Sequence, residues 1–178
     1  MRPYFKLLLL LLITACSKPE ETSNTPAYFD LKTYFENEAV RLQKRKPVLT
    51  KTVTQNGESE KKDIKIADWK SELGFFTMSD INKPAWRDSY RTIDNANQLT
   101  YLAKEDGLKT QKVEIYRNAQ GAIKQISILN KTSNLLYTST ENLHYFPDSV
   151  YTITKQQKVL LNRTNTYQIN SVFKHSVK

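Results

Sequence analysis

Hydrophobic residues recur at a helical spacing in two segments of the chain. In the first segment Thr25 and Pro26 are suited to begin a helix, and Pro47 is suited to end it. A second helical segment is predicted from Asp68 to about Lys83. The apolar positions are Tyr28, Leu31, Phe35, Ala39 and Leu42 in the first helix, and Trp69, Leu73 and Phe76 in the second.

Elsewhere the polar and apolar positions alternate, which predicts β-strands. Residues 48–55 and the stretch up to about Ile66 form a predicted hairpin, because Asn56-Gly57 between them is a strong turn signal. Seven more strands are predicted near 86–94, 97–105, 108–117, 122–131, 134–146, 149–160 and 165–174. The connections are so short that consecutive strands must be antiparallel neighbours.

These elements predict an α+β fold in a single domain, residues 27–178. We expect a strongly curved antiparallel β-meander sheet covered by the two α-helices, because one face of such a sheet has to be buried. A half-open or fully closed barrel of the lipocalin kind is the alternative, since the number of strands approaches what closure needs.

The N-terminus predicts a lipoprotein signal peptide over residues 1–15. A short cationic stretch precedes seven large aliphatic residues, which are too few to span a bilayer. The following Ile13-Thr14-Ala15-Cys16 resembles the lipobox of bacterial prolipoproteins, which implies that Cys16 carries diacylglyceryl and N-acyl groups such as palmitate. Residues 16–26 are then the acylated cysteine and a polar, flexible tether.

We therefore expect a lipid anchor in the outer membrane. Lys18-Pro19-Glu20-Glu21 resembles a signal that sends some Bacteroidota lipoproteins to the cell surface, so the surface is favoured over the periplasmic face, and the choice stays open. After loss of Arg2 and Lys6, 25 basic residues against 18 acidic ones leave a charge of +7. Such a charge on an exported protein favours anionic lipid headgroups or acidic glycans over nucleic acid, so no nucleic-acid partner is expected.

No residue pattern predicts catalysis, a metal or a cofactor. The two histidines, His144 and His175, have no second ligand at a metal-binding spacing, and Cys16 is the only cysteine. There is no nucleophile elbow and no glycine-rich phosphate loop. We expect a protein that is not an enzyme and has no cofactor.

Tyrosine is spread over all the predicted meander strands, and two interpretations compete. Tyrosines suit a half-buried pleated surface, so they are expected mainly to build the core. The other interpretation is a ligand-facing aromatic surface that holds a lipid chain or stacks on a sugar. The candidates for that role are Tyr101, Tyr116, Tyr137, Tyr151 and Tyr167, of which Tyr116 shares a face with Glu114 instead of with apolar residues.

Two longer patterns resemble an uncharacterised group of Bacteroidota lipoproteins: Asp80-Ile81-Asn82-Lys83-Pro84, and Tyr151-x-Ile153 followed by Gln157-Lys158-Val159. The resemblance implies export and acylation, and no activity. Two functions are therefore expected of the chain. The first is a non-enzymatic, membrane-anchored envelope lipoprotein that binds a lipid or other hydrophobic ligand, a glycan or a partner protein through its sheet. The second is a structural accessory subunit of an outer-membrane protein complex, with no small-molecule ligand.

Overall fold

The computed structural model describes residues 25–159 and 163–174. The helical elements are α1 (Leu31–Arg45), α2 (Trp69–Glu72), α3 (Gly74–Thr77) and the 3-10 turn η2 (Pro84–Trp86). The strands are β1 (Val48–Gln55), β2 (Glu58–Lys65), β3 (Tyr90–Asn95), β4 (Gln98–Ala103), β5 (Thr110–Arg117), β6 (Ile123–Ser133), β7 (Tyr137–Phe146), β8 (Val150–Val159) and β9 (Arg163–Phe173). The predicted α+β class and antiparallel meander are confirmed.

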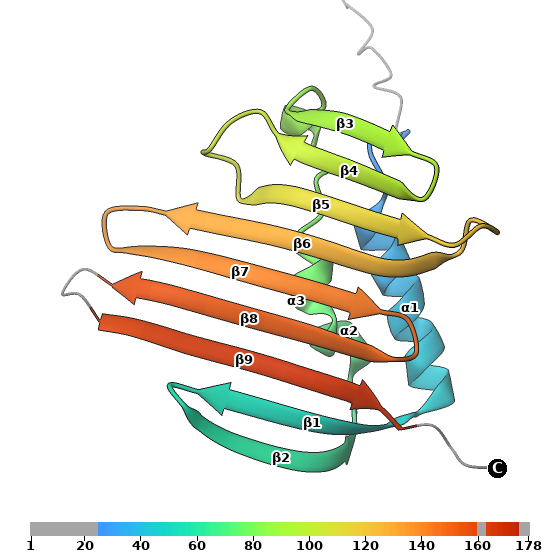
Figure 1. Cartoon of the computed structure of the whole chain (residues 1–178), viewed down its shortest axis with the longest axis vertical. Helices are drawn as coiled ribbons and strands as arrows, with labels where there is room; N and C mark the ends of the chain where they lie inside the picture. Colours follow the sequence, from blue (N-terminus) through green and yellow to red (C-terminus); the bar gives the residue numbers. More distant parts are fainter. Residues whose placement is uncertain (1–24, 160–162, 175–178) are drawn as a thin grey trace, which may run out of the picture.

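One sheet contains all nine strands of the described residues, in the order β2-β1-β9-β8-β7-β6-β5-β4-β3. The first hairpin therefore joins the last strand of the chain, with Leu49 of β1 opposite Phe173 of β9. Helices α1, α2 and α3 all lie behind the sheet in Figure 1, and no described helix covers the face turned to the viewer. We call these the covered face and the open face.

The predicted β1–β2 hairpin is confirmed. Asn56 and Gly57 both have positive φ angles, of 50° and 94°, and Gln55 pairs with Glu58 across the turn. Positive φ at both central residues is the requirement of a type I′ turn, which fits the twist of the two strands that it joins.

Helix α1 begins later than predicted. Its N-cap is Asp30, whose side chain accepts a hydrogen bond from the Thr33 N–H at 2.8 Å. The residues before it do not become helical, because the Tyr28 N–H donates to the Asn82 side chain at 2.9 Å. The predicted end is confirmed, with Lys44 and Arg45 in the last turn and Lys46 in a left-handed conformation before Pro47.

The second predicted helix forms only as two separate four-residue turns, α2 and α3. Asp68 caps α2 as expected, accepting from the N–H groups of Lys70 and Ser71. Leu73 then leaves the helical conformation with ψ near 8°, immediately before Gly74. Glycine is a poor helix former. On either side of this break Trp69 packs on Phe173, and Phe76 packs on Phe35.

The core between the helices and the covered face consists largely of aromatic rings. Phe35 of α1 stacks on Phe76 of α3 with 4.8 Å between ring centroids, and it meets Tyr145 of β7 edge to face at 5.2 Å. Trp69 lies parallel to Phe173 at 5.9 Å. These rings fill the space between the two layers.

The expected strong curvature is wrong, and so is the half-open or closed barrel. The sheet is open and not strongly curled, with β2 and β3 as its free edges (Figure 1). The helices and their aromatic partners already bury the covered face, so the sheet does not have to wrap around itself to do so. Both edge strands are mostly exposed, and β2 carries six charged residues among its eight, a composition that discourages pairing at an edge.

Removing the ring of Phe35 tests the core. Phe35 is fully buried, so Phe35→Ala is expected to lower the free energy of unfolding by about 3–5 kcal/mol. Val40→Ala on the same helix, at a residue that is 55% exposed, is the matched control and should change it by less than about 0.5 kcal/mol. Urea unfolding followed by circular dichroism measures both, and equal effects of the two variants would contradict this core.

Candidate functional site

The strand register separates the five candidate tyrosines. Tyr101, Tyr151 and Tyr167 lie on the covered face, as does Tyr137 at the start of β7. Tyr116 lies on the open face together with Glu114, as the alternation along the strand predicts. The structure therefore does not gather the five into one aromatic surface.

Two of these tyrosines use their hydroxyl groups inside the protein. The hydroxyl of Tyr101 accepts a hydrogen bond from the Phe29 N–H at 2.8 Å. Tyr151 is fully buried and donates to the Glu72 carboxylate of α2, which also receives the ammonium group of Lys51 at 2.6 Å. Tyr101 thus holds the segment before α1, at Phe29, against the sheet, and Tyr151 holds α2.

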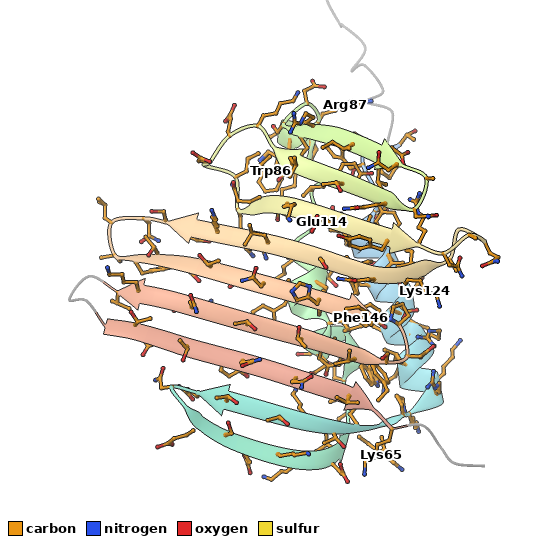
Figure 2. The ribbon with its side chains drawn as sticks, in the orientation of Figure 1. Lys65, Trp86, Arg87, Glu114, Lys124 and Phe146 are labelled. Atoms are coloured by element: carbon orange, nitrogen blue, oxygen red, sulfur yellow. The ribbon has the colours of Figure 1, made fainter. Side chains whose placement is uncertain are left out.

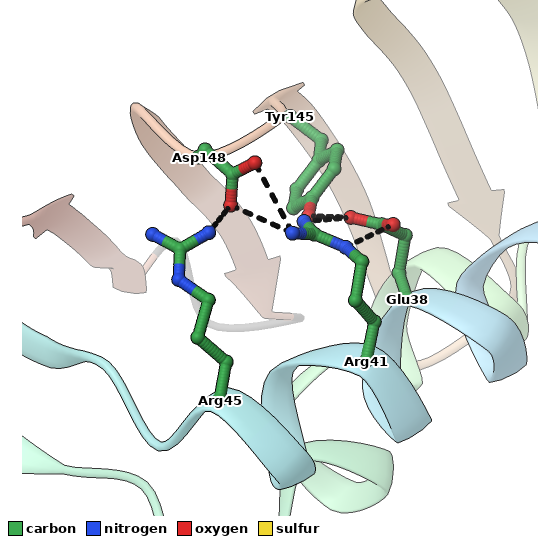
Figure 3. A network of polar contacts seen from close by, with 5 residues as sticks. All are labelled: Glu38, Arg41, Arg45, Tyr145 and Asp148. Carbon is green, nitrogen blue, oxygen red and sulfur yellow. Dashed lines mark hydrogen bonds and ion pairs between the residues drawn. The ribbon is translucent and has the colours of Figure 1, made fainter.

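A second carboxylate attaches α1 to the same region of the sheet (Figure 3). Tyr145 of β7 donates to Glu38 at 2.5 Å, and the guanidinium group of Arg41 holds both oxygens of that carboxylate at 2.8 Å. Arg41 also reaches both oxygens of Asp148 in the β7–β8 turn, and Arg45 contacts the same carboxylate. Each carboxylate is neutralised by an arginine, so the cluster is suited to hold two elements together.

Another polar cluster lies under the covered face. The amide of Asn130 donates to Ser79 at 2.8 Å and to Glu141 at 3.3 Å, while Lys155 pairs with Glu141 at 3.0 Å. Ser79 also ties the segment after α3 to β5, because its carbonyl oxygen accepts from the Thr110 hydroxyl. This cluster positions the end of α3.

The open face is polar and arranged in rows across the strands. One row runs Thr52, Asn170, Thr152, His144, Ser127, Glu114 and Thr100. The next runs Thr54, Gln168, Thr154, Asn142, Leu129, Lys112, Leu102 and Arg91. Figure 2 shows side chains, Glu114 among those labelled, along these strands. In this second row neutral hydrogen-bonding groups occupy β1, β9, β8 and β7, whereas apolar and basic groups alternate over β6 to β3.

A hollow of about 600 Å³ lies where the basic and apolar groups alternate. Its floor contains Leu102 and Leu129, which flank Lys112 in the strand register. The other lining residues are Arg91, Ala103, Lys104, Gln111 and Lys131. We call this the basic hollow, because four of its eight lining residues are basic and none is acidic.

The charges of the basic hollow are only partly compensated. Lys112 pairs with the nearby Glu114 at 3.0 Å, and Lys104 donates to the Asp88 carbonyl at 2.7 Å. Within residues 25–159 and 163–174, no ion pair involves Arg91 or Lys131. An anion over the hollow would therefore meet cationic groups from three strands, around an apolar floor.

Two other hollows have mixed charge. One, of about 420 Å³, lies between the start of α1 and residues 80–87, where Asp80 and Asn82 are already engaged in holding the N-terminal segment. The other, of about 460 Å³, lies between α1 and α2, where Asp68 caps a helix and Gln43 bonds to the backbone of Ala67. Their polar groups serve the fold.

The basic hollow was not predicted from the sequence, although a partial signal was there. Alternation of polar and apolar residues predicts which residues of one strand share a face, and this places Leu102 with Lys104, or Leu129 with Lys131. It does not predict the register between strands, nor the bulge between Thr110 and Lys112 that sets the row. The partial signal was the spacing that places Leu102 with Lys104, and Leu129 with Lys131, on one face of a strand.

Three further observations concern the expected chemistry. The described residues contain no group of three potential metal-ligating side chains. No helix within residues 25–159 and 163–174 is long and apolar enough to cross a membrane. The predicted lipidation site, Cys16, lies outside the described residues.

The tyrosine contacts predict how stability responds to alkali. Burial, followed by the Glu38 carboxylate, raises the pKa of Tyr145 well above its usual value of 10. A raised pKa in the folded state means that stability is retained below about pH 10 and lost as the pH rises, because the unfolded chain ionises first. The pKa is also raised, chiefly by burial, for Tyr34, Tyr90, Tyr101 and Tyr151.

We expect the free energy of unfolding to fall above pH 10 by up to about 1.4 kcal/mol per pH unit for each such tyrosine. Tyr145→Phe should reduce this slope by the contribution of one tyrosine, up to about 1.4 kcal/mol per pH unit. Urea unfolding at a series of pH values between 8 and about 11 measures it. An unchanged slope in Tyr145→Phe would contradict the assignment.

Comparison with protein-family models, with curated proteins and with solved structures finds no match for this chain. Any function must therefore be argued from the chain's own residues.

Proposed function

We propose that this chain is a non-enzymatic, membrane-anchored envelope lipoprotein whose open face binds an acidic glycan. The observation that carries the proposal is the basic hollow, where Arg91, Lys104, Lys112 and Lys131 surround an apolar floor on a face that no described helix covers. Basic side chains bind carboxylate or phosphate groups, and aliphatic side chains pack on the apolar face of a sugar ring.

The rest of the open face supports a chain-like ligand. The rows next to the hollow offer neutral hydrogen-bonding side chains, such as Asn142, Thr154 and Gln168, which can both donate to and accept from sugar hydroxyl groups. Antiparallel neighbours stand about 4.8 Å apart, so groups repeat across the sheet at a spacing close to the length of one sugar unit. An extended glycan lying across the strands would meet them in succession.

A lipid chain between the helices and the sheet is less well supported. That space is occupied by the stacked rings of Phe35, Phe76 and Tyr145, and by Trp69 on Phe173. A carried acyl chain needs a lined cavity, and each of the three hollows described above lies on the outside of these layers.

The anchor in the proposal rests on the sequence. Cys16 in its lipobox would carry the acyl groups, and residues 16–26 would be the tether to the domain. We place the protein at the outer membrane, with the cell surface favoured by Lys18-Pro19-Glu20-Glu21, because acidic glycans are abundant there.

The alternative proposal, an accessory subunit of an envelope complex, is favoured by a different feature of the open face. Phe146, Val150 and Val172 are neighbours in one row near the β7–β8 turn, and 43% of Val172 is exposed. A protein partner would use such apolar residues as anchors. A standard interface buries roughly 800 Å² per partner around several large side chains, which three residues do not provide.

Binding to a defined polyanionic glycan tests the main proposal. The mature chain with Cys16→Ser should bind hyaluronan, a carboxylate-bearing glycan, and not neutral dextran, in isothermal titration calorimetry. Arg91→Gln with Lys131→Gln should weaken binding about threefold to tenfold, because each exposed ion pair contributes about 0.2–1 kcal/mol. Binding of the parent should also weaken as salt is added.

The matched control is Lys70→Gln, which removes an exposed positive charge from α2, away from the open face. It should leave hyaluronan affinity within about twofold, since surface charges act over roughly 8 Å. Equal binding of dextran, or equal weakening by Lys70→Gln, would contradict recognition by the basic hollow.

The anchor is tested separately in cells. Cys16→Ser in the full chain is expected to move the protein from the membrane fraction to the soluble fraction, because the sulfur that accepts the lipid is lost. Fractionation followed by immunoblotting measures this. Retention of the variant in the membrane fraction at the parent's level would contradict a lipid anchor at Cys16.

A further inference from the structure

The β6–β7 hairpin ends in two leucines that contact little of the protein. Leu135 is 92% exposed and Leu136 is 67% exposed. The other described turns between neighbouring strands contain no two adjacent leucines, and several are rich in polar residues and glycine, such as Asn56-Gly57 in β1–β2 and Asn118 to Gly121 in β5–β6. Among the turns that the structure describes, two adjacent exposed leucines therefore distinguish this connection.

The tip has a fixed conformation. The side-chain oxygen of Asn134 accepts hydrogen bonds from the N–H groups of Leu136 and Tyr137, at 2.9 and 3.0 Å. The Asn134 N–H donates to the Tyr137 carbonyl at 3.0 Å. Because the turn is already ordered, burying the two leucines against a partner would cost little backbone entropy.

Apolar and basic residues lie near the tip, beside neutral polar ones such as Asn134 and Thr138. Val159 at the end of β8 is 36% exposed and pairs with Tyr137, so an aliphatic and an aromatic side chain lie just behind the leucines. Lys158 pairs with Thr138 at the same end of the sheet, and Lys131 lies four positions before Leu135. The nearest carboxylate along β7, that of Glu141, is buried and paired with Lys155.

The place of the tip in the fold leaves it accessible. In Figure 1 the β6–β7 connection lies at the left end of the sheet, whereas α1 lies behind the right part and α2 and α3 behind the middle. The hairpin therefore projects from the end of the sheet that the described helices do not reach.

We propose that the β6–β7 tip inserts Leu135 and Leu136 into the surface of an anionic lipid bilayer. The leucines would enter the outer part of the hydrocarbon layer, Tyr137 would lie at the level of the headgroups, and Lys131 and Lys158 would face lipid phosphates. The two lysines, and the pairing of the nearby Glu141 with Lys155, favour an anionic membrane over an apolar protein partner. This inference goes beyond the proposed glycan site and does not depend on acylation of Cys16.

Vesicle binding tests the inference on the mature chain, residues 16–178, with Cys16→Ser, which retains every described element and carries no acyl group. We expect it to sediment with vesicles of phosphatidylcholine containing about one third phosphatidylglycerol, and much less with phosphatidylcholine alone. Leu135→Ser with Leu136→Ser should lower the partition coefficient about tenfold or more, without changing the midpoint of thermal unfolding, because both side chains are exposed. Val40→Ser, at the exposed residue of α1, is the matched control and should bind like the parent.

A fluorescent label reports which residue enters the bilayer. With Cys16 replaced the chain has no cysteine, so Leu135→Cys provides a single site for an environment-sensitive dye, and Val40→Cys provides the control. Vesicles should shift the emission of the dye at position 135 to the blue and leave the dye at position 40 unchanged.

Two results would overturn the inference. One is equal partitioning of the parent and the Leu135→Ser, Leu136→Ser variant, which would mean that binding uses the basic hollow or another surface. The other is an absence of vesicle binding combined with concentration-dependent dimerisation that the double variant abolishes, which would make the tip a protein contact. Failure of hyaluronan binding with retained vesicle binding would contradict only the proposed glycan site.

Discussion

Two carboxylates inside the molecule determine how its helices lie on its sheet. Glu38 of α1 accepts from the Tyr145 hydroxyl, and Glu72 of α2 accepts from the Tyr151 hydroxyl. Because Tyr145 and Tyr151 are cross-strand partners, both helices dock at the same place on β7 and β8. Each carboxylate also binds a cation, Arg41 or Lys51, which offsets the cost of burying its charge. Loss of one partner would leave the other group partly buried and unpaired, which is destabilising.

The position of the helix layer decides which surfaces are available for binding. The helices and their aromatic side chains bury the covered face, so the sheet stays open and its second face remains in contact with solvent. On that face the cross-strand rows bring together residues from many strands, which creates the basic hollow from β3 to β6. The same layer stops short of the end of the sheet where the β6–β7 hairpin projects (Figure 1). Both proposed surfaces thus follow from where two helices are attached.

Short-range patterns in the sequence predict the helices, strands and turns. Contacts between residues that are far apart in the sequence set the features that could not be predicted. The Asn56-Gly57 turn, the N-cap at Asp68 and the strand alternation depend on near neighbours, and the structure confirms them. The predicted start of α1 was wrong because the side chain of Asn82, far along the chain, accepts a hydrogen bond from the backbone N–H of Tyr28. The predicted strong curvature of the sheet was wrong because curvature depends on how fully the helices bury the covered face. Pairing of β1 with β9 and the bulge in β5 set the register of the open face, and no single strand encodes either.

The register between strands also explains why the tyrosines predicted as candidates do not form a binding surface, whereas basic residues line a hollow. Tyrosine spacing correctly indicated a sheet with a packed face, and Tyr101 and Tyr151 have their hydroxyl groups bonded within it. The open face instead brings Lys131 to the rim of the basic hollow, four residues from Leu135 at the hairpin tip. Along an extended strand this separation is roughly 13 Å. A bilayer that held the tip would therefore have Lys131 at its headgroups and the rest of the basic hollow beyond them, where the acidic sugars of membrane glycolipids extend. Attachment at the tip would then raise the effective concentration of such a ligand at the hollow, so the proposed glycan site would be occupied more fully at the membrane than in solution.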